Sequence, residues 1–206
     1  MSNTANKTNV NIKKICIWGI TSETQNASTF GSALDLTGRA RSFTDTPTVN
    51  KAELYGSGKL QETILMSGTG NLTLAVNYLT AAERAVLFSE NTSITRFPAG
   101  VQGIKENSQP KLCAVAIMTE CTPDGSIVNL YKYLAVTFQP NEETVAQIEG
   151  NSINYSTVQI TGNYRKHRGI GYVKSASRHV DTTTSAGQTL VNSWFTTPGF
   201  IGTPIT

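Results

Sequence analysis

Charged residues are scarce in this chain of 206 residues, at 15%, and only two histidines are present. Both His167 and His179 fall in a basic stretch, and we interpret them as solvated or interface residues, since the cations beside His167 oppose its protonation. There is no G-x-S-x-G, no phosphate-cradling glycine loop and no paired C-x-x-C. The sequence therefore predicts no catalytic residue, cofactor or metal site, and a protein that is not an enzyme.

The three cysteines have no metal-binding spacing. Cys113 and Cys121 are expected on one strand, too far apart for a disulfide, and with Cys16 are interpreted as free buried thiols in a reducing compartment. No apolar run approaches the ~18 residues of a membrane span, and residues 1–14 lack the apolar core of a signal peptide. The net charge of +3 is too small to indicate a nucleic-acid binder by itself. We expect folding in a cytoplasm and no membrane partner.

Serine, threonine, asparagine and glycine take the place of charge, which favours strands and loops over long helices. Strands are expected over residues 12–20, 33–36, 49–55, 59–66 and 71–78. The pair 49–55 and 59–66 is expected to meet across Gly56-Ser57-Gly58, whereas 38–48 and 91–109 are expected to be irregular. One helix is predicted, because Thr80 and Glu83 form a capping box before a run of helix formers that should end near residues 89–92.

A long β-hairpin is predicted around the turn at residues 122–125, where Pro123, Asp124 and Gly125 suit a type I turn with a glycine bulge. One face should carry Leu112, Ala114, Ala116 and Met118 with Val128, Leu130, Leu134 and Val136. The other should carry Cys113, Val115 and Ile117 with Tyr131, Tyr133 and Ala135. Neither face is polar, so both must be covered, by the chain itself or by another copy.

The composition changes at the end of this block. Residues 164–181 hold five cations and both histidines, and a Thr-, Gly- and Pro-rich stretch without periodicity follows. We interpret residues 1–11 as a flexible arm, 12–165 as a β domain, and 166–206 as a basic arm whose aromatic residues anchor on another surface. Deleting residues 181–206 is accordingly expected to leave a folded subunit but to weaken its polymerisation. The cations could bind nucleic acid, but contact with an acidic patch on a neighbouring copy is favoured.

The order of these features resembles the major tail protein, or tail tube protein, of long-tailed bacteriophages with flexible tails. The stretch AELYGSGKLQETILMSGTGNLTLAVNYLTAAERAVLF, the hairpin around TPDGS and a late strand pair ending INYSTVQITGNYR carry the likeness over residues 12–165. The late pair matches the form I-x-x-x-S-I-x-Y/P-x-T-x-x-I-T at Ile148, Ser152, Ile153, Tyr155, Thr157, Ile160 and Thr161.

The resemblance implies a mainly β fold, a β-sandwich or half-barrel with one short flanking helix. It implies that six copies form a ring whose inner sheets join into one β-barrel, and that rings stack through loops and arms. The implied partners are other copies, the tape measure protein, and the tail terminator and baseplate or initiator proteins, with duplex DNA as passing cargo. The implied location is the tail of the virion, assembled in the host cytoplasm.

Several residues are assigned to contacts on this basis. Candidates for the sheet between subunits are Val115, Ile117, Tyr131 and Tyr133. Candidates for stacking arms are Arg165, Lys166, Arg168, Trp194 and Phe195. A wall that lets DNA slide must be neutral or acidic, because cations would hold the phosphates. From strand position, the lumen candidates are Glu142, Glu143 and Glu149, and the cations of residues 165–178 should point outward or into contacts between rings.

A different class of function is a monomeric β-sandwich binding module, for instance one that recognises carbohydrate on a host surface. Such modules present exposed aromatic residues on a loop face, whereas the aromatic residues here are expected on strands and in the final stretch. A tube of a contractile tail is a near neighbour that the sequence separates poorly from a non-contractile one.

Overall fold

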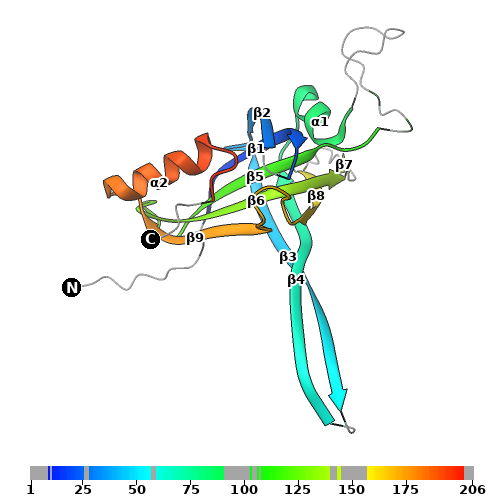
Figure 1. Cartoon of the computed structure of the whole chain (residues 1–206). Helices are drawn as coiled ribbons and strands as arrows, with labels where there is room; N and C mark the ends of the chain where they lie inside the picture. Colours follow the sequence, from blue (N-terminus) through cyan, green and yellow to red (C-terminus); the bar gives the residue numbers. More distant parts are fainter. Residues whose placement is uncertain are drawn as a thin grey trace, which may run out of the picture.

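The computed structural model describes residues 9, 11–25, 28–56, 59–90, 103, 106, 108–139, 143–144 and 157–201, with the backbone alone at 52, 54–56, 59–62, 64–67 and 143–144. Nine strands and two helices follow one another in the described chain (Figure 1). They are β1 (Asn11–Glu23), β2 (Ser28–Asp35), β3 (Ala40–Gly56), β4 (Lys59–Val76), α1 (Ala81–Phe88), β5 (Leu112–Glu120), β6 (Ile127–Gln139), β7 (Glu143–Thr144), β8 (Thr157–Arg165), β9 (Lys174–Asp181) and α2 (Ser185–Thr196). The mainly β prediction is confirmed, but two helices are present where one was expected.

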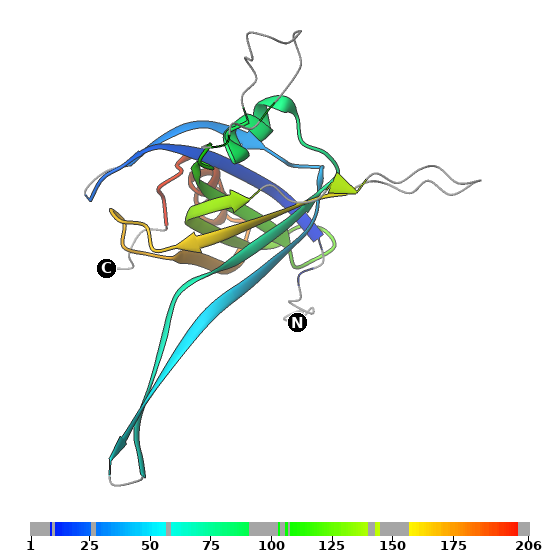
Figure 2. The ribbon, with the colours of Figure 1, turned by 90° about the vertical axis from the view of Figure 1, so that its right-hand side faces the viewer.

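The strands form a single antiparallel sheet with the order β2-β1-β5-β6-β8-β4-β3, to which β7 adds beside β8 and β9 beside β6. Strand β6 is shared, because its residues 127–133 pair with β9 and its residues 136–139 pair with β8. We call β2-β1-β5-β6-β9 the first wing and β6-β8-β4-β3 the second wing. The two wings curl toward each other into a half-barrel that stays open in the monomer (Figure 2).

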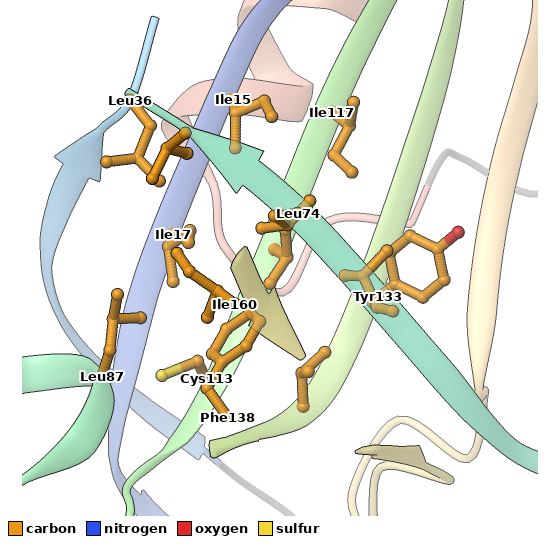
Figure 3. Packing of buried hydrophobic residues seen from close by; sticks show 14 of the residues in the cluster. Ile15, Ile17, Leu36, Leu74, Leu87, Cys113, Ile117, Tyr133, Phe138 and Ile160 are labelled. Atoms are coloured by element: carbon orange, nitrogen blue, oxygen red, sulfur yellow. The ribbon is translucent and has the colours of Figure 1, made fainter. Parts of the chain in front are cut away.

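The larger core fills the inside of the half-barrel. Its side chains come from the inner faces of both wings and from α1 (Figure 3). The buried members are Ile15, Ile17, Leu36, Leu72, Leu74, Val76, Leu87, Phe88, Cys113, Val115, Ile117, Tyr133, Val136, Phe138, Ile160 and Tyr164. The alternation of Leu72, Leu74 and Val76, read from the sequence as one buried face, is confirmed, since all three are fully buried.

A second core lies between the first wing and α2. It consists of Cys16, Trp18, Ala114, Ala116, Met118, Val128, Leu130, Val180, Trp194 and Phe195. Helix α2 therefore covers the face of β5 and β6 that points away from the larger core. The three cysteines are buried and free. No helix in the described part of the chain is long and apolar enough to cross a membrane.

The predicted hairpin of β5 and β6 is present, and its turn has the expected chemistry. Gly125 has φ +69° and its N–H donates to the carbonyl of Thr122 at 3.0 Å, as in a type I turn closed by a left-handed glycine. The facing of Val115 with Tyr133 is also confirmed. The expected register fails farther from the turn, where a bulge places two residues of β6 opposite one of β5. Val136 consequently pairs with Cys113 and joins the larger core, on the face opposite to the one expected.

The capping box at the start of α1 is confirmed. The hydroxyl of Thr80 accepts from the backbone N–H of Glu83, and the Glu83 carboxylate accepts from the backbone N–H of Thr80 at 2.7 Å. Helix α1 ends at Phe88, followed by Ser89 in the left-handed conformation. The expectation that 38–48 is irregular is wrong, because β3 begins at Ala40 and pairs along its length with β4. The stretch 91–109 lies largely outside the described residues.

Candidate assembly surfaces

The outer part of the β3–β4 hairpin projects away from the body of the protein (Figure 1). Strands β3 and β4 pair as far as Gly56 and Lys59, but β4 pairs with β8 only from Thr69 onward. Residues 49–56 and 59–68, which we call the ribbon, therefore pair only with each other among the described strands. At ~3.3 Å per residue the ribbon reaches roughly 25 Å. Its pairing across residues 56–59 confirms the sequence prediction.

The ribbon has an unusual composition for an element with one partner strand. Its sequence includes the apolar residues Val49, Ala52, Leu54, Tyr55, Leu60, Ile64, Leu65 and Met66. The side chain of Val49, where the ribbon leaves the body, is 54% exposed. A two-stranded hairpin is at best marginally stable alone in water. Among the described elements, the ribbon is therefore a candidate for binding another surface.

A polar cluster of Asp45, Tyr164 and Lys174 lies where the ribbon leaves the body. Asp45 of β3 accepts from the hydroxyl of Tyr164 at 2.7 Å and from Nζ of Lys174 at 2.6 Å. Burial would raise the pKa of Asp45, but the hydrogen bonds from Lys174 and Tyr164 outweigh it and lower the pKa below its ordinary value. The Tyr164 hydroxyl passes over Gly70, where a Cβ would lie 2.2 Å from it, so residue 70 must be glycine.

Four strands have an edge that pairs with no other strand in the described part of the chain. They are β2, which pairs only with β1, β9, which pairs only with β6, β3, which pairs only with β4, and the two-residue β7, which pairs only with β8. An open edge presents unpaired N–H and C=O groups and invites another strand. On β3 this row is interrupted at Pro47, which has no N–H to donate. Edges of this kind are candidates for pairing between copies.

The residues predicted to form a sheet between subunits lie inside the subunit. Val115 and Ile117 belong to β5, an interior strand between β1 and β6, and are fully buried. Tyr133 is 1% exposed, and Tyr131 is partly buried against Phe43, with ring centroids 5.3 Å apart. The two cores cover both faces of the hairpin, so of the two alternatives it is the chain itself that covers them. A contact of these residues with a copy stays a prediction.

The basic stretch is partly tied to the body. The Glu23 carboxylate, at the end of β1, accepts from Arg165 at 2.6 Å and from the backbone N–H of Arg168 at 2.9 Å. Burial opposes ionisation of Glu23, but these hydrogen bonds prevail and its pKa is lowered. Lys166 is exposed. The predicted role of Arg165, Lys166 and Arg168 in stacking stays a prediction.

The interpretation of His167 as solvated is wrong, because its side chain is fully buried. Its Nδ1 accepts from the backbone N–H of Ile170 at 3.1 Å, so the proton of the neutral ring lies on Nε2, which donates to the Ser28 hydroxyl at 3.0 Å. Burial lowers the pKa of His167 and favours this neutral form. The histidine joins the end of the β1–β2 hairpin to the loop before β9.

The stretch after residue 181 was expected to lack regular structure, and this is wrong because it contains α2. Trp194 and Phe195, predicted as stacking anchors, are 1% and 7% exposed within their own chain. The Trp194 indole N–H donates to the carbonyl of Tyr131 at 3.2 Å. The start of α2 has a signal that the sequence shows, since Thr184 caps the helix by accepting from the N–H of Gly187 at 3.1 Å. The sequence alone does not indicate the apolar surface on which α2 packs.

Lys132 of β6 connects this helix to the sheet and was not singled out from the sequence. Its side chain is fully buried, and Nζ donates at 2.7 Å to the carbonyls of both Trp194 and Thr197 at the end of α2. Nζ also lies 5.4 Å from the ring centroid of Trp18 and 5.5 Å from that of Trp194. Burial lowers the pKa of Lys132 to about 7. The ammonium therefore releases its proton far below the range of an exposed lysine.

This lowered pKa predicts a pH-dependent stability. The unfolded chain keeps Lys132 protonated up to its ordinary pKa while the folded chain releases the proton near pH 7, so folding becomes more favourable as pH rises. Between pH 7 and 8.5 the free energy of unfolding should rise on the order of 1 kcal/mol more in the native chain than in Lys132→Met. Denaturant titrations at each pH measure the free energy of unfolding of the two proteins. An equal change of this free energy with pH in both proteins would contradict the buried, deprotonated lysine.

Two of the three lumen candidates lie outside the described residues, namely Glu142 and Glu149. Glu143 lies in β7, where its backbone pairs with Val158. Their assignment to the lumen stays a prediction. No group of three or more His, Cys, Asp or Glu residues in the described chain could hold a metal ion.

Comparisons with known proteins give only structural neighbours. No protein-family model matches the chain, and no curated protein matches it. Among solved structures, a chain from the cap that terminates the tube of the anti-feeding prophage aligns with 86% of this chain and 99% of its own length, at 12% identity and a TM-score of 0.43. A chain from the baseplate of the anti-feeding prophage aligns with 86% and 98%, at 12% identity and a TM-score of 0.44.

Proposed function

We propose that this protein is the structural subunit of a phage-type tail tube. Copies join side by side into rings, and rings stack into a conduit for the genome. The ribbon carries the proposal, because it leaves the body as a two-stranded element of apolar composition that pairs with no further strand among the described residues. Docking on a copy in the next ring supplies the surface that a lone hairpin lacks.

The open edges support lateral assembly. In a closed ring the edge of one copy pairs with an edge of the next, which satisfies the free backbone groups and removes the hazard of uncontrolled pairing. The sequence resemblance to tail tube proteins points the same way and sets the proposed ring at six copies. The partners proposed with it are the tape measure protein, the tail terminator, the baseplate or initiator proteins, and duplex DNA as transient cargo in the virion tail.

The carbohydrate-binding alternative finds no platform in the described structure. The large apolar side chains that are exposed there are Val49, Tyr78 and Tyr172, which come from separate elements. The Tyr78 ring is covered by the guanidinium of Arg39, whose Cζ lies 4.9 Å from the ring centroid. Stacking on a sugar favours an open aromatic face, and the cation occupies one face of the Tyr78 ring.

Purified protein tests the proposal directly. Concentrated subunit, examined by negative-stain electron microscopy and analytical ultracentrifugation, should form rings or tubes of uniform diameter, and a reversible monomer should dominate on dilution. A protein that remains a monomer at every concentration and binds glycans on an array would overturn the proposal in favour of the carbohydrate-binding module.

A further inference from the structure

The outer face of the second wing has an unusual chemistry. Successive residues of a strand point to opposite sides, and directly paired residues share a side. The residues that point away from the larger core, which we call the polar face, are Ser42, Thr44, Thr46 and Thr48 on β3, Thr69, Asn71, Thr73 and Ala75 on β4, Thr137 and Gln139 on β6, and Gln159, Thr161, Asn163 and Arg165 on β8. All are exposed or half-buried.

Hydroxyl and amide groups cover almost all of this face. Arg165, at its rim, is the single charged member, and its charge is opposed by Glu23 at 2.6 Å. Arg165 is thus the exception to the expectation that the cations of residues 165–178 point away from a lumen. No member is aromatic. Neighbouring hydroxyls are close enough to share hydrogen bonds, as between Thr73 and Thr161, whose oxygens lie 3.4 Å apart. A hollow of about 370 Å³ over Gly70 and Asn163 adds room for water on the same face.

We propose that the polar face lines the lumen of the tube and that duplex DNA slides over it. This inference rests on the proposed function and adds to it the surface that meets the cargo. Cations along a channel would hold phosphates through counterion release, and aromatic rings would stack on bases. The polar face offers neither, while its hydroxyl and amide groups keep a layer of water on the wall.

Two contrasts within the molecule support this orientation. Contacts between proteins are enriched in aromatic residues, Met and Arg, so a broad Thr- and Asn-rich face is poorly suited to be buried between copies. Strand β9 exposes Lys174 and Arg178, both on the first wing. A polyanion would be retained by those cations, so they belong on the outside or at contacts between rings.

Cysteine labelling of assembled tubes tests the orientation. The native thiols are buried, so a cysteine introduced at Asn163 reports on the polar face alone. The matched control is Asn192→Cys, on the exposed side of α2. Each variant is treated with a small maleimide and with a maleimide carried on a globular protein too large to enter the tube, both as free subunits and as tubes. Gln159→Cys replaces Asn163→Cys if the latter misfolds.

Free subunits of both variants should react with both reagents. In tubes, Asn163→Cys should keep its reaction with the small reagent and lose that with the large reagent by at least an order of magnitude, while Asn192→Cys keeps both. Reaction of Asn163→Cys tubes with both reagents places the face outside, and reaction with neither places it between copies. Either result overturns the inference about the polar face but leaves the proposed tube-forming function standing. Failure of the unmodified chain to form tubes overturns the proposed function, and this inference falls with it.

Discussion

Chains that lack the ribbon should fold but form no tubes. Replacing residues 49–68 by Asn-Gly joins Thr48 to Thr69, the last directly paired residues before the ribbon, through a two-residue turn that suits a hairpin. The pairing of β4 with β8 begins at Thr69 and is untouched. The larger core and the polar cluster at Asp45 therefore remain, whereas the ribbon, which is proposed to bind the next ring, is removed.

Ultracentrifugation and electron microscopy measure the assembly of this variant, and denaturant unfolding measures its stability. Thr63→Ala, an exposed position within the ribbon, is the matched control and should still assemble. Tubes of normal length and diameter from the shortened chain would show that the ribbon does not hold rings together, and the proposed function would lose the observation that carries it.

Truncating Trp194 should be the most damaging single substitution in α2. Its side chain is 1% exposed, its indole N–H donates to the carbonyl of Tyr131, and its ring centroid lies 5.5 Å from Nζ of Lys132. Replacing a buried Trp by Ala typically costs about 3–5 kcal/mol. We expect Trp194→Ala to lower the free energy of unfolding by about that amount, measured by denaturant titration.

Asn192→Ala, two residues away on the exposed side of α2, is the control and should change stability by less than ~0.5 kcal/mol. A loss below ~1 kcal/mol for Trp194→Ala would mean that α2 is dispensable to the fold, as the sequence alone suggested. The structure reverses that earlier expectation for a chain cut at residue 181, because the cut would uncover Trp18, Met118 and Leu130 of the second core.

The parts of the fold predictable from the sequence are those with a strong local signal. The capping box at Thr80 and Glu83 fixes the start of α1, and the Pro-Asp-Gly turn fixes the β5–β6 hairpin. The alternation through Leu72 and Leu74 identifies one buried face. Each of these signals lies within a few residues of chain and needs no knowledge of distant partners.

The parts that were missed depend on distant contacts. Residues 40–48 seemed irregular because the outward positions are Ser and Thr, and only Phe43 marks the inward side. Helix α2 was missed because its apolar residues pack on Trp18 and Leu130, far away in sequence. The bulge that turns Val136 inward follows from how β6 serves both wings. The polar face could not be predicted from the sequence either, because its members come from four strands that only the fold brings together.

The continuity of β4 has a mechanical consequence. The strand runs from the tip of the ribbon into the body and ends at Val76, and its inner half pairs residue by residue with β8 at eight positions. A pull on the ribbon tip, as when a filament stretches or flexes, is directed along this strand. The hydrogen bonds between β4 and β8 are then loaded in shear, so they bear the force together and do not break one after another. The ribbon can therefore bend or separate at its tip while the paired half of β4 stays bound to β8.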